Sequence, residues 1–332
     1  MKTVELKQDV GTGLELAPYM ATLIEQLKCD HKFPAAHGYL CALHSFQRFS
    51  GGRDVPLPIR EVFTHERLKA YEEWLVVGQK RKLNTVSGYM RSLRAVYNRL
   101  MPPGSAEHDP RMFSDVYTKV VSPTKRALDN GQMERLMAID FSCLPREQQA
   151  VLAYFLLMFM LRGMPFIDIA HLRRSNIRNG ELIYHRHKTK KPLSMEIPLQ
   201  ARRLIERYCN PDPDGDYLFP ILPKGLHGGW EEYQCYQDAL RCFNRLLQLA
   251  VMRLLPGVPV SSYTARHTWA TLAYHMGVPV GRISQSLGHS SIRVTEVYLK
   301  PFDNKQLDET NRQVLASVKK GKWKGIAAFN TL

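Results

Sequence analysis

A Pro-Pro-Gly sequence about a third of the way along the chain constrains its fold most strongly. Proline lacks a backbone N–H and its ring clashes with the preceding helical turn, so a helix cannot continue through Pro102-Pro103. Residues before this point show helical periodicity, whereas residues 106–126 show little regular pattern. We therefore predict a helical domain over residues 1–105, a linker over 106–126, and a second domain over 127–332 with a tail from about 303.

In the first domain, apolar residues recur at helical spacing over residues 39–49, 66–77 and, most clearly, 84–100. Asn84 is expected to cap the third helix. The polar face of that helix carries side chains at steps of four, three and four, which can donate hydrogen bonds to phosphates and base edges: Ser87, Arg91, Arg94 and Asn98. A merely solvated polar face is the alternative interpretation of this pattern.

The second domain is predicted to be mainly helical, and Asp129 or Asn130 can cap its first helix. Its exception lies between Leu182 and Leu199, where the apolar residues alternate: Leu193, Met195, Ile197 and Leu199. A period of two predicts a β-hairpin, with the lysines of residues 188–191 at its tip. The predicted fold class is therefore mainly α with a small β-hairpin, in two domains.

The chain carries an excess of positive charge, with 46 Lys and Arg against 31 Asp and Glu, a formal charge of +15. Such an excess favours a polyanionic partner, and nucleic acid is the commonest one. The six cysteines form no CxxC pair, which is typical of reduced thiols in the cytoplasm. The first residues lack an apolar segment, so we expect neither a secretory signal nor a membrane segment.

Residues 262–298 are predicted to form three short helices in succession. Gly277 and Gly288 end the first two, and Ser290 or Ser291 begins the third, which carries Tyr298. Arg266, His289 and Tyr298 then lie near the joints between helices. Packing these helices together can bring the three side chains to one pocket.

That set of side chains suits transesterification at a phosphodiester. A phenol has a pKa near 10 and needs a positive, preorganised site to attack at neutral pH. Guanidinium groups can stabilise the charge of the transition state, an imidazole can hold the phosphate, and a lysine can protonate the leaving oxygen. Each residue alone also has a structural explanation, since a Gly-His after a helix is commonly a C-cap and Tyr298 is one of fifteen tyrosines.

The order of these residues resembles the signature of the tyrosine recombinases, also called the phage integrase family. Arg266-His267-Thr-Trp-Ala-Thr271 is similar to the family's Arg-His-Thr-Phe-Ala-Thr box, and Leu287-Gly-His289 is similar to its Leu-Gly-His box. Residues 1–105 likewise resemble the family's core-binding domain. The resemblance implies a set of catalytic and supporting residues, with Tyr298 as nucleophile: Arg162, Lys188, Tyr263, Arg266, His289 and Tyr298, supported by Asp168 and His267.

Two departures from the family pattern stand out. Tyr263 occupies the position where the family usually has histidine, and a phenol cannot carry imidazolium charge. The spacing from Arg162 to Asp168 is about three residues longer than usual. Lys190 and Lys191 also compete with Lys188 for the role of general acid, and Lys190 is a candidate DNA contact.

The resemblance implies a site-specific DNA recombinase that integrates, excises or inverts DNA through a 3′-phosphotyrosyl intermediate at Tyr298. Its implied partner is double-stranded DNA, bound as a homotetramer on two sites, with accessory DNA-bending or directionality proteins as further candidates. No metal or other cofactor is expected, because arginines can stabilise the charge. The alternatives are relaxation of DNA by a type IB topoisomerase and a DNA-binding regulator that has lost catalysis.

Overall fold

The computed structural model describes residues 13–121, 127–226, 228–299, 301 and 304–318. The chain divides into two compact units. Unit 1 comprises residues 1–123 and 226–234, and unit 2 comprises residues 124–225 and 235–332. Each unit is described by itself below.

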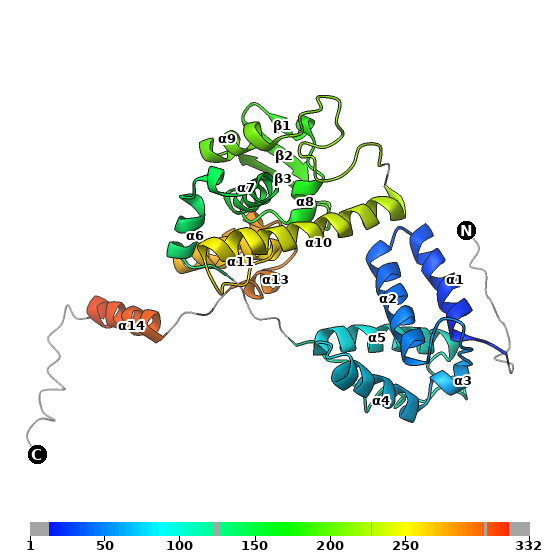
Figure 1. Ribbon diagram of the computed structural model, residues 1–332. Coiled ribbons are helices and arrows are strands. Elements are labelled where there is room, and N and C mark those ends of the chain that lie inside the picture. Colours follow the sequence, from blue (N-terminus) through cyan, green and yellow to red (C-terminus); the bar gives the residue numbers. More distant parts are fainter. Residues whose placement is uncertain (1–12, 122–126, 227, 300, 302–303, 319–332) are drawn as a thin grey trace, which may run out of the picture. The chain divides into compact units, whose positions relative to one another are not determined.

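Five α-helices and a π-helical turn form the greater part of unit 1 (Figure 1). They are α1 (Leu16–Cys29), α2 (Phe33–Phe49), α3 (Ile59–Val62), α4 (His65–Glu73), the π turn η1 (Trp74–Gly78) and α5 (Leu83–Leu100). The core lies where α2 packs against α1 and α5. On α5 the buried side chains recur at helical spacing and include Val86, Met90 and Leu93.

The start of α5 differs from the sequence prediction. Lys82 precedes the helix as its N-cap, so Asn84 lies inside the first turn and does not cap it. The Asn84 amide instead exchanges two hydrogen bonds of 2.8 Å with the backbone of Val121. The Asn84 side chain therefore holds the backbone at Val121, which is distant in sequence, against helix α5.

The predicted linker over residues 106–126 is also corrected over its described part, because residues up to Val121 pack on unit 1. Phe113 and Val116 are buried in the core of this unit. The Tyr97 hydroxyl accepts a hydrogen bond of 2.6 Å from the Asp109 backbone. These contacts, which join residues far apart in sequence, were not visible in the weak local pattern of the segment.

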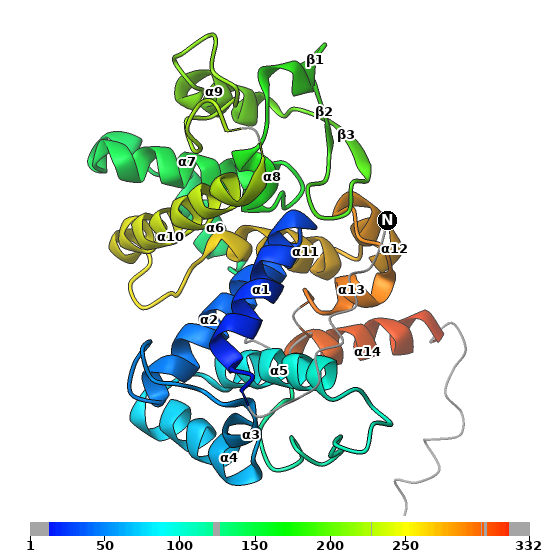
Figure 2. The same ribbon diagram turned by 90° about the vertical axis from the view of Figure 1, so that its right-hand side faces the viewer.

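Unit 2 contains the remaining helices and a small sheet (Figure 2). Its elements are α6 (Asn130–Met137), η2 (Phe141–Cys143), α7 (Arg146–Met160), α8 (Phe166–Ala170), η3 (Arg174–Asn176), β1 (Ile177–Arg178), β2 (Glu181–His185), β3 (Pro192–Glu196), α9 (Leu199–Tyr208), α11 (Ser262–His275), α12 (Val280–Ser286), α13 (Ile292–Glu296) and α14 (Asn304–Val318). Helix α10 (Gly229–Leu254) begins in unit 1 and continues in unit 2.

Helix α7 forms the centre of unit 2. Every side chain from Val151 to Met158 is buried, so the helix is enclosed on all sides. It packs against α9 and α11. Asp129 caps α6 through a capping box with Gln132, which confirms one of the two predicted caps.

The predicted hairpin is present within a three-stranded antiparallel sheet of order β1-β2-β3, and strand β1 was not predicted. In the register of the hairpin, Leu182 pairs with Met195, and both are buried. The alternation ends earlier than predicted, because Leu199 begins α9 and is 57% exposed. The predicted fold class, mainly α with a small β element, is confirmed.

Helices α11, α12 and α13 end and begin close to the glycines and the serine that the sequence analysis identified. Gly277 and Gly288 follow α11 and α12, and Ser291 precedes α13. Tyr298 lies in the turn after α13 and not on the helix itself. Among the residues that the structure describes, no helix has both the length and the apolarity that crossing a bilayer requires.

The central position of α7 gives a direct test of the fold. We expect Leu152→Ala to lower the free energy of unfolding by about 2–5 kcal/mol, because Leu152 is fully buried and its truncation leaves a cavity. Leu199→Ala is the matched control, and its exposed side chain predicts a change within about 0.5 kcal/mol. Urea unfolding followed by circular dichroism measures both, and equal losses would contradict this description of the core.

Candidate active site

Arg266 lies at the centre of a buried polar cluster in unit 2. Its side chain is 2% exposed on α11. The guanidinium donates hydrogen bonds to the carbonyl oxygens of Gly163, at 2.8 Å, and Leu287, at 2.6 Å. It also lies 2.8 Å from Nε2 of His289. Burial and the neighbouring Arg186 lower the pKa of Arg266, and the phenols of Tyr298 and Tyr184 oppose this shift.

The turn after α7 can approach Arg266 only because residue 163 is glycine. Gly163 has φ +66°, and a Cβ atom there would lie 3.1 Å from the Arg266 Cα. Contacts of that length are tighter than ordinary van der Waals packing, so a side chain would push the turn away from α11. This close approach brings the Gly163 carbonyl to the guanidinium.

His289 follows α12 and is oriented by two partners. Arginine has no acceptor, so the hydrogen bond from Arg266 requires an unprotonated Nε2, and Nδ1–H then donates to the Thr295 hydroxyl at 2.8 Å. Burial, followed by Arg266, Arg186 and the lysines Lys188 and Lys191, lowers the pKa of His289 to about 3. The imidazole is therefore neutral at pH 7 before any substrate binds.

Arg186 is a further member of the cluster that sequence reasoning missed. Its Nε lies 2.8 Å from Oδ2 of Asp168, and both side chains are buried. Its Nη1 donates to the Leu287 carbonyl, the same oxygen that Arg266 binds. The other Asp168 oxygen accepts a hydrogen bond of 2.9 Å from the His187 backbone. Burial raises the pKa of Asp168, and Arg186 and this backbone N–H oppose the rise.

Arg162 contacts strand β3. It has a left-handed backbone with φ 55°, it is half-buried, and its Nη1 lies 3.4 Å from the Ser194 carbonyl on β3. The guanidinium beside Asp168 and Arg266 thus belongs to Arg186 and not to Arg162. A signal for Arg186 was present in the sequence, since it stands two residues before Lys188 on the predicted hairpin.

The Tyr298 ring packs against two histidines. Its ring lies 4.8 Å from that of His267 and 5.0 Å from that of His289, measured between centroids. The Arg266 guanidinium lies 5.4 Å from the same ring. The Tyr298 carbonyl accepts hydrogen bonds from Nδ1 of His267, at 3.3 Å, and from the Thr271 hydroxyl, at 3.4 Å. One face of α11 therefore anchors the backbone of Tyr298 beside the guanidinium.

The hairpin lysines and Tyr263 border this cluster. Lys188, Lys190 and Lys191 are all exposed, and Lys191 donates a hydrogen bond of 3.0 Å to the His289 carbonyl. Tyr263 is also exposed, and its ring lies 6.3 Å from that of His267. The choice among the three lysines stays a prediction.

The predicted DNA-binding face of α5 needs one correction. Ser87 is fully buried, so its hydroxyl cannot reach a ligand at the surface. Arg91, Arg94 and Asn98 are exposed on the same helix. Ser87 lies four residues before Arg91, on the part of the helix surface that faces the core. The spacing of the polar residues alone does not reveal where that buried surface begins.

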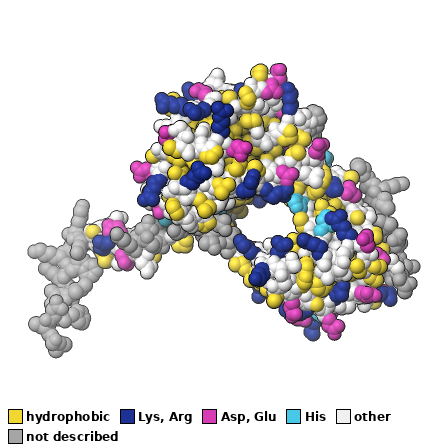
Figure 3. All heavy atoms as spheres, viewed as in Figure 1, with side chains coloured by type: hydrophobic (Ala, Val, Ile, Leu, Met, Phe, Trp, Pro, Cys, Tyr) yellow, Lys and Arg dark blue, Asp and Glu magenta, His cyan; other side chains and the backbone are white. Residues whose placement is uncertain are grey.

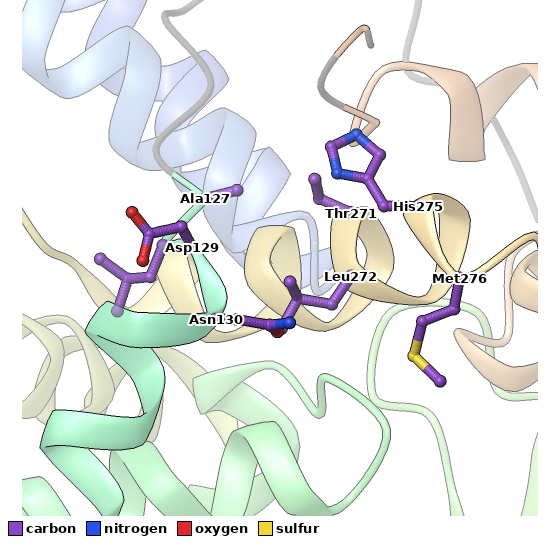
Figure 4. A pocket seen from close by; sticks show the side chains of 8 residues that line it. Ala127, Asp129, Asn130, Thr271, Leu272, His275 and Met276 are labelled. Atoms are coloured by element: carbon purple, nitrogen blue, oxygen red, sulfur yellow. The ribbon is translucent and has the colours of Figure 1, made fainter. Parts of the chain in front are cut away.

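A pocket of about 340 Å³ lies between the start of α6 and the C-terminal half of α11 (Figure 4). Asp129 and Asn130 line it on one side, and Leu272, His275 and Met276 line it on the other. Thr271 is also part of its lining and donates to the Tyr298 carbonyl. The pocket therefore borders the helix that anchors Tyr298.

Comparison with known proteins decides the family. The model of the phage integrase family matches residues 126–305, more than half of the chain. The chain belongs to the phage integrase family. This confirms the resemblance seen in the sequence: the protein is a tyrosine-type site-specific recombinase, an enzyme that acts on DNA.

Individual relatives are distant. A tyrosine recombinase of Thermosipho africanus (strain TCF52B) is 22% identical over 251 residues, which cover 74% of this chain and 82% of the relative. Two solved structures share the fold at TM-scores of 0.60 and 0.56. The first is a lambda integrase tetramer bound to a Holliday junction, 14% identical, with 89% of this chain and 80% of that chain covered. The second is the Tn1549 transposon integrase (residues 82–397) in complex with circular intermediate DNA, 14% identical, with 91% of this chain and 100% of that chain covered.

The close approach at Gly163 can be tested by substitution. Gly163→Ala is expected to destabilise the protein by about 1–3 kcal/mol, since it combines a left-handed backbone with crowding against Arg266. Gly257→Ala is the matched control, because φ is +76° there and a Cβ atom would meet nothing within 4 Å. Thermal unfolding measures both variants. If Gly257→Ala lowers the free energy of unfolding as much as Gly163→Ala does, the crowding against α11 does not contribute to the destabilisation.

Proposed function

We propose that this recombinase cuts and rejoins one strand of duplex DNA at a time, with Tyr298 as the nucleophile. The Tyr298 oxygen attacks the phosphorus of a backbone phosphodiester and loses its proton to solvent water, and the bond from phosphorus to the 5′ oxygen breaks. The products are a 3′-phosphotyrosyl link and a free 5′-hydroxyl. A 5′-hydroxyl from the partner strand then attacks this link, which restores a phosphodiester and releases Tyr298.

The observation that carries this proposal is the convergence of two buried guanidiniums on the Leu287 carbonyl, with one of them beside the Tyr298 ring. Arg266 and Arg186 share the Leu287 carbonyl, and Arg266 also lies 5.4 Å from the Tyr298 ring centroid. Guanidiniums at that position can hold the non-bridging oxygens of a phosphate and stabilise charge that grows in the transition state. We assign this clamp to Arg186 and Arg266, with Asp168 fixing Arg186.

The remaining roles follow from position. His289 is neutral and orients Arg266 before DNA binds. A phosphate anion beside the ring favours uptake of a proton at Nε2, which then donates a hydrogen bond to a phosphate oxygen. A lysine of the hairpin, Lys188 by its place in the family pattern, protonates the leaving 5′ oxygen. His267 positions Tyr298 through the backbone carbonyl. Tyr263 can donate a hydrogen bond to phosphate but supplies no charge.

The assembly is proposed on separate grounds. Recombination joins two duplexes, and the lambda integrase structure that shares this fold is a tetramer on a Holliday junction. Helix α14 exposes Leu307, Val314 and Leu315, an apolar stripe that suits contact with a neighbouring copy. We therefore infer a homotetramer on two DNA sites. Accessory DNA-bending proteins are not part of this proposal.

The proposed biological outcome of this reaction is integration, excision or inversion of DNA. The fold shared with the Tn1549 transposon integrase supports a role in a mobile element. None of the six cysteines, all of which lie in described residues, forms a disulfide, which supports a cytoplasmic enzyme.

Covalent capture tests the nucleophile. A target site is first selected from a random duplex library by binding, and a nicked duplex of that sequence then traps the cleaved intermediate. Wild type is expected to form a covalent adduct that Tyr298→Phe cannot form, because the attacking oxygen is gone. Tyr263→Phe is the matched control: it still forms the adduct, but more slowly, because it loses only one hydrogen bond to phosphate. Adduct formation by Tyr298→Phe would overturn the assignment.

The identity of the second clamp arginine is testable in the same assay. Arg186→Lys is expected to slow adduct formation by about 100-fold or more at saturating DNA, since a lysine cannot hold both Asp168 and the phosphate. It keeps a positive charge beside the buried carboxylate, and circular dichroism checks that the variant folds. Arg162→Lys is the control with the smaller expected loss. A greater loss for Arg162→Lys would assign the clamp to Arg162 instead.

A further inference from the structure

Two histidines of unit 2, His171 and His187, lie against each other, and the proposed reaction uses neither imidazole. The centroids of the two rings are 4.7 Å apart, and the ring planes are inclined at 37°. Each ring offers one nitrogen that can bind a metal ion, and these two nitrogens lie within 4.8 Å of each other. We refer to these two residues as the histidine pair.

A backbone contact decides which nitrogen of His171 can bind a metal. Nδ1 lies 2.7 Å from the carbonyl oxygen of Ile167. A carbonyl oxygen only accepts hydrogen bonds, so Nδ1 carries the proton and the lone pair of the neutral ring is on Nε2. Histidines that bind metals usually donate their other N–H to a carbonyl or a carboxylate in the same way. His171 is therefore held in the tautomer that binding through Nε2 requires.

Helix α8 positions both members of the histidine pair. Asp168 lies on this helix, and His171 caps its end three residues later. The backbone N–H of His187 donates a hydrogen bond of 2.9 Å to Oδ1 of Asp168. The helix thus carries His171 directly and holds His187 beside it through the Asp168 carboxylate.

The separation of the two nitrogens suits a single ion between them. Bonds from zinc to histidine nitrogen are about 2.0–2.1 Å long, so two nitrogens on a tetrahedral ion lie about 3.3 Å apart. The nitrogens of the histidine pair are within 4.8 Å, and rotation of the imidazoles about their side-chain bonds can close the difference. The other two positions of a tetrahedral ion then remain for water.

The chemistry of the donors selects the class of ion. Imidazole nitrogens suit zinc, copper and nickel, whereas magnesium and calcium prefer oxygen ligands. General electrostatic attraction does not favour a cation here, because the chain has a formal charge of +15 and Lys and Arg side chains are scattered over the visible face of unit 2 (Figure 3). The affinity for a cation must therefore come from coordination by the two rings.

We propose that the histidine pair binds a divalent transition-metal ion of the zinc type, which braces the connection between β2 and β3 against α8. His187 stands between Arg186 and Lys188 in the sequence, so the ion fixes the chain between a clamp arginine and the proposed general acid. The ion takes no part in the chemistry at Tyr298, where the arginines supply the positive charge. The site does not depend on the proposed reaction.

Calorimetric titration of the metal-free protein with Zn²⁺, in the absence of DNA, tests the site. The double variant His171→Gln/His187→Gln is expected to bind one Zn²⁺ ion fewer per chain than wild type, while any ions bound by the six cysteines remain. His185→Gln removes an exposed histidine from the same hairpin and is the matched control, with the stoichiometry of wild type. Equal stoichiometry for wild type and the double variant would overturn the proposal.

NMR spectroscopy of wild type tests the same site without any substitution that could disturb folding. We expect the ring signals of His171 and His187 to shift together as Zn²⁺ is added, while those of His185 stay fixed. Mg²⁺ is the second probe and is expected to shift neither ring, because it prefers oxygen ligands. Fixed signals of the histidine pair in Zn²⁺, or an equal response to Mg²⁺, would exclude the site.

Amide hydrogen exchange tests the brace. With free Zn²⁺ at about ten times its Kd, exchange of the backbone amides of residues 186–191 is expected to slow by up to about tenfold, the factor by which a ligand at this concentration shifts a local opening equilibrium. The double variant is expected to show no change with Zn²⁺. Unchanged exchange in wild type that has bound Zn²⁺ would overturn the brace. None of these measurements uses DNA, so they are decided independently of covalent capture at Tyr298.

Discussion

The carbonyl oxygen of Leu287 accepts hydrogen bonds from two buried arginines, and the proposed active site depends on this shared contact. Arg266 reaches it from α11 and Arg186 reaches it from the end of β2. Two guanidiniums repel each other, and buried charge is costly unless it is paired. Among the described residues, Asp168 is the one carboxylate that forms an ion pair with either of them. The cluster therefore holds an excess of positive charge that an incoming phosphate can neutralise.

Contacts within the protein hold the side chains of the proposed site in place without DNA. Gly163 allows the turn after α7 to press against Arg266, and the Gly163 carbonyl fixes the guanidinium. Thr295 fixes the neutral tautomer of His289, so the ring accepts from Arg266 and does not compete with it as a charge. Preorganised dipoles and charges of this kind need no rearrangement at the moment of reaction, which is how electrostatic stabilisation lowers a barrier.

Sequence reasoning predicted the parts of the site that lie on a local pattern. The helices around Arg266, His289 and Tyr298 end where glycines and serines indicate, so their joints could be placed from the sequence. Arg186 was missed because its importance comes from burial against Asp168 and Leu287, which lie 18 and 101 residues away from it along the chain. In addition, the family pattern drew attention to the neighbouring Lys188. Ser87 was misplaced for the same reason, since helical spacing gives a face but not the exact edge of the core.

The nucleophile is the claim on which the account depends most. Its most direct test is mass spectrometry of the protein that has been trapped on nicked target DNA and digested with protease and nuclease. The account predicts one nucleotide-bearing peptide, with the phosphate on Tyr298 and linked to the 3′ end of the cleaved strand. Attachment at Tyr263, the exposed phenol on the same helix as Arg266, or linkage through a 5′ phosphate would contradict it.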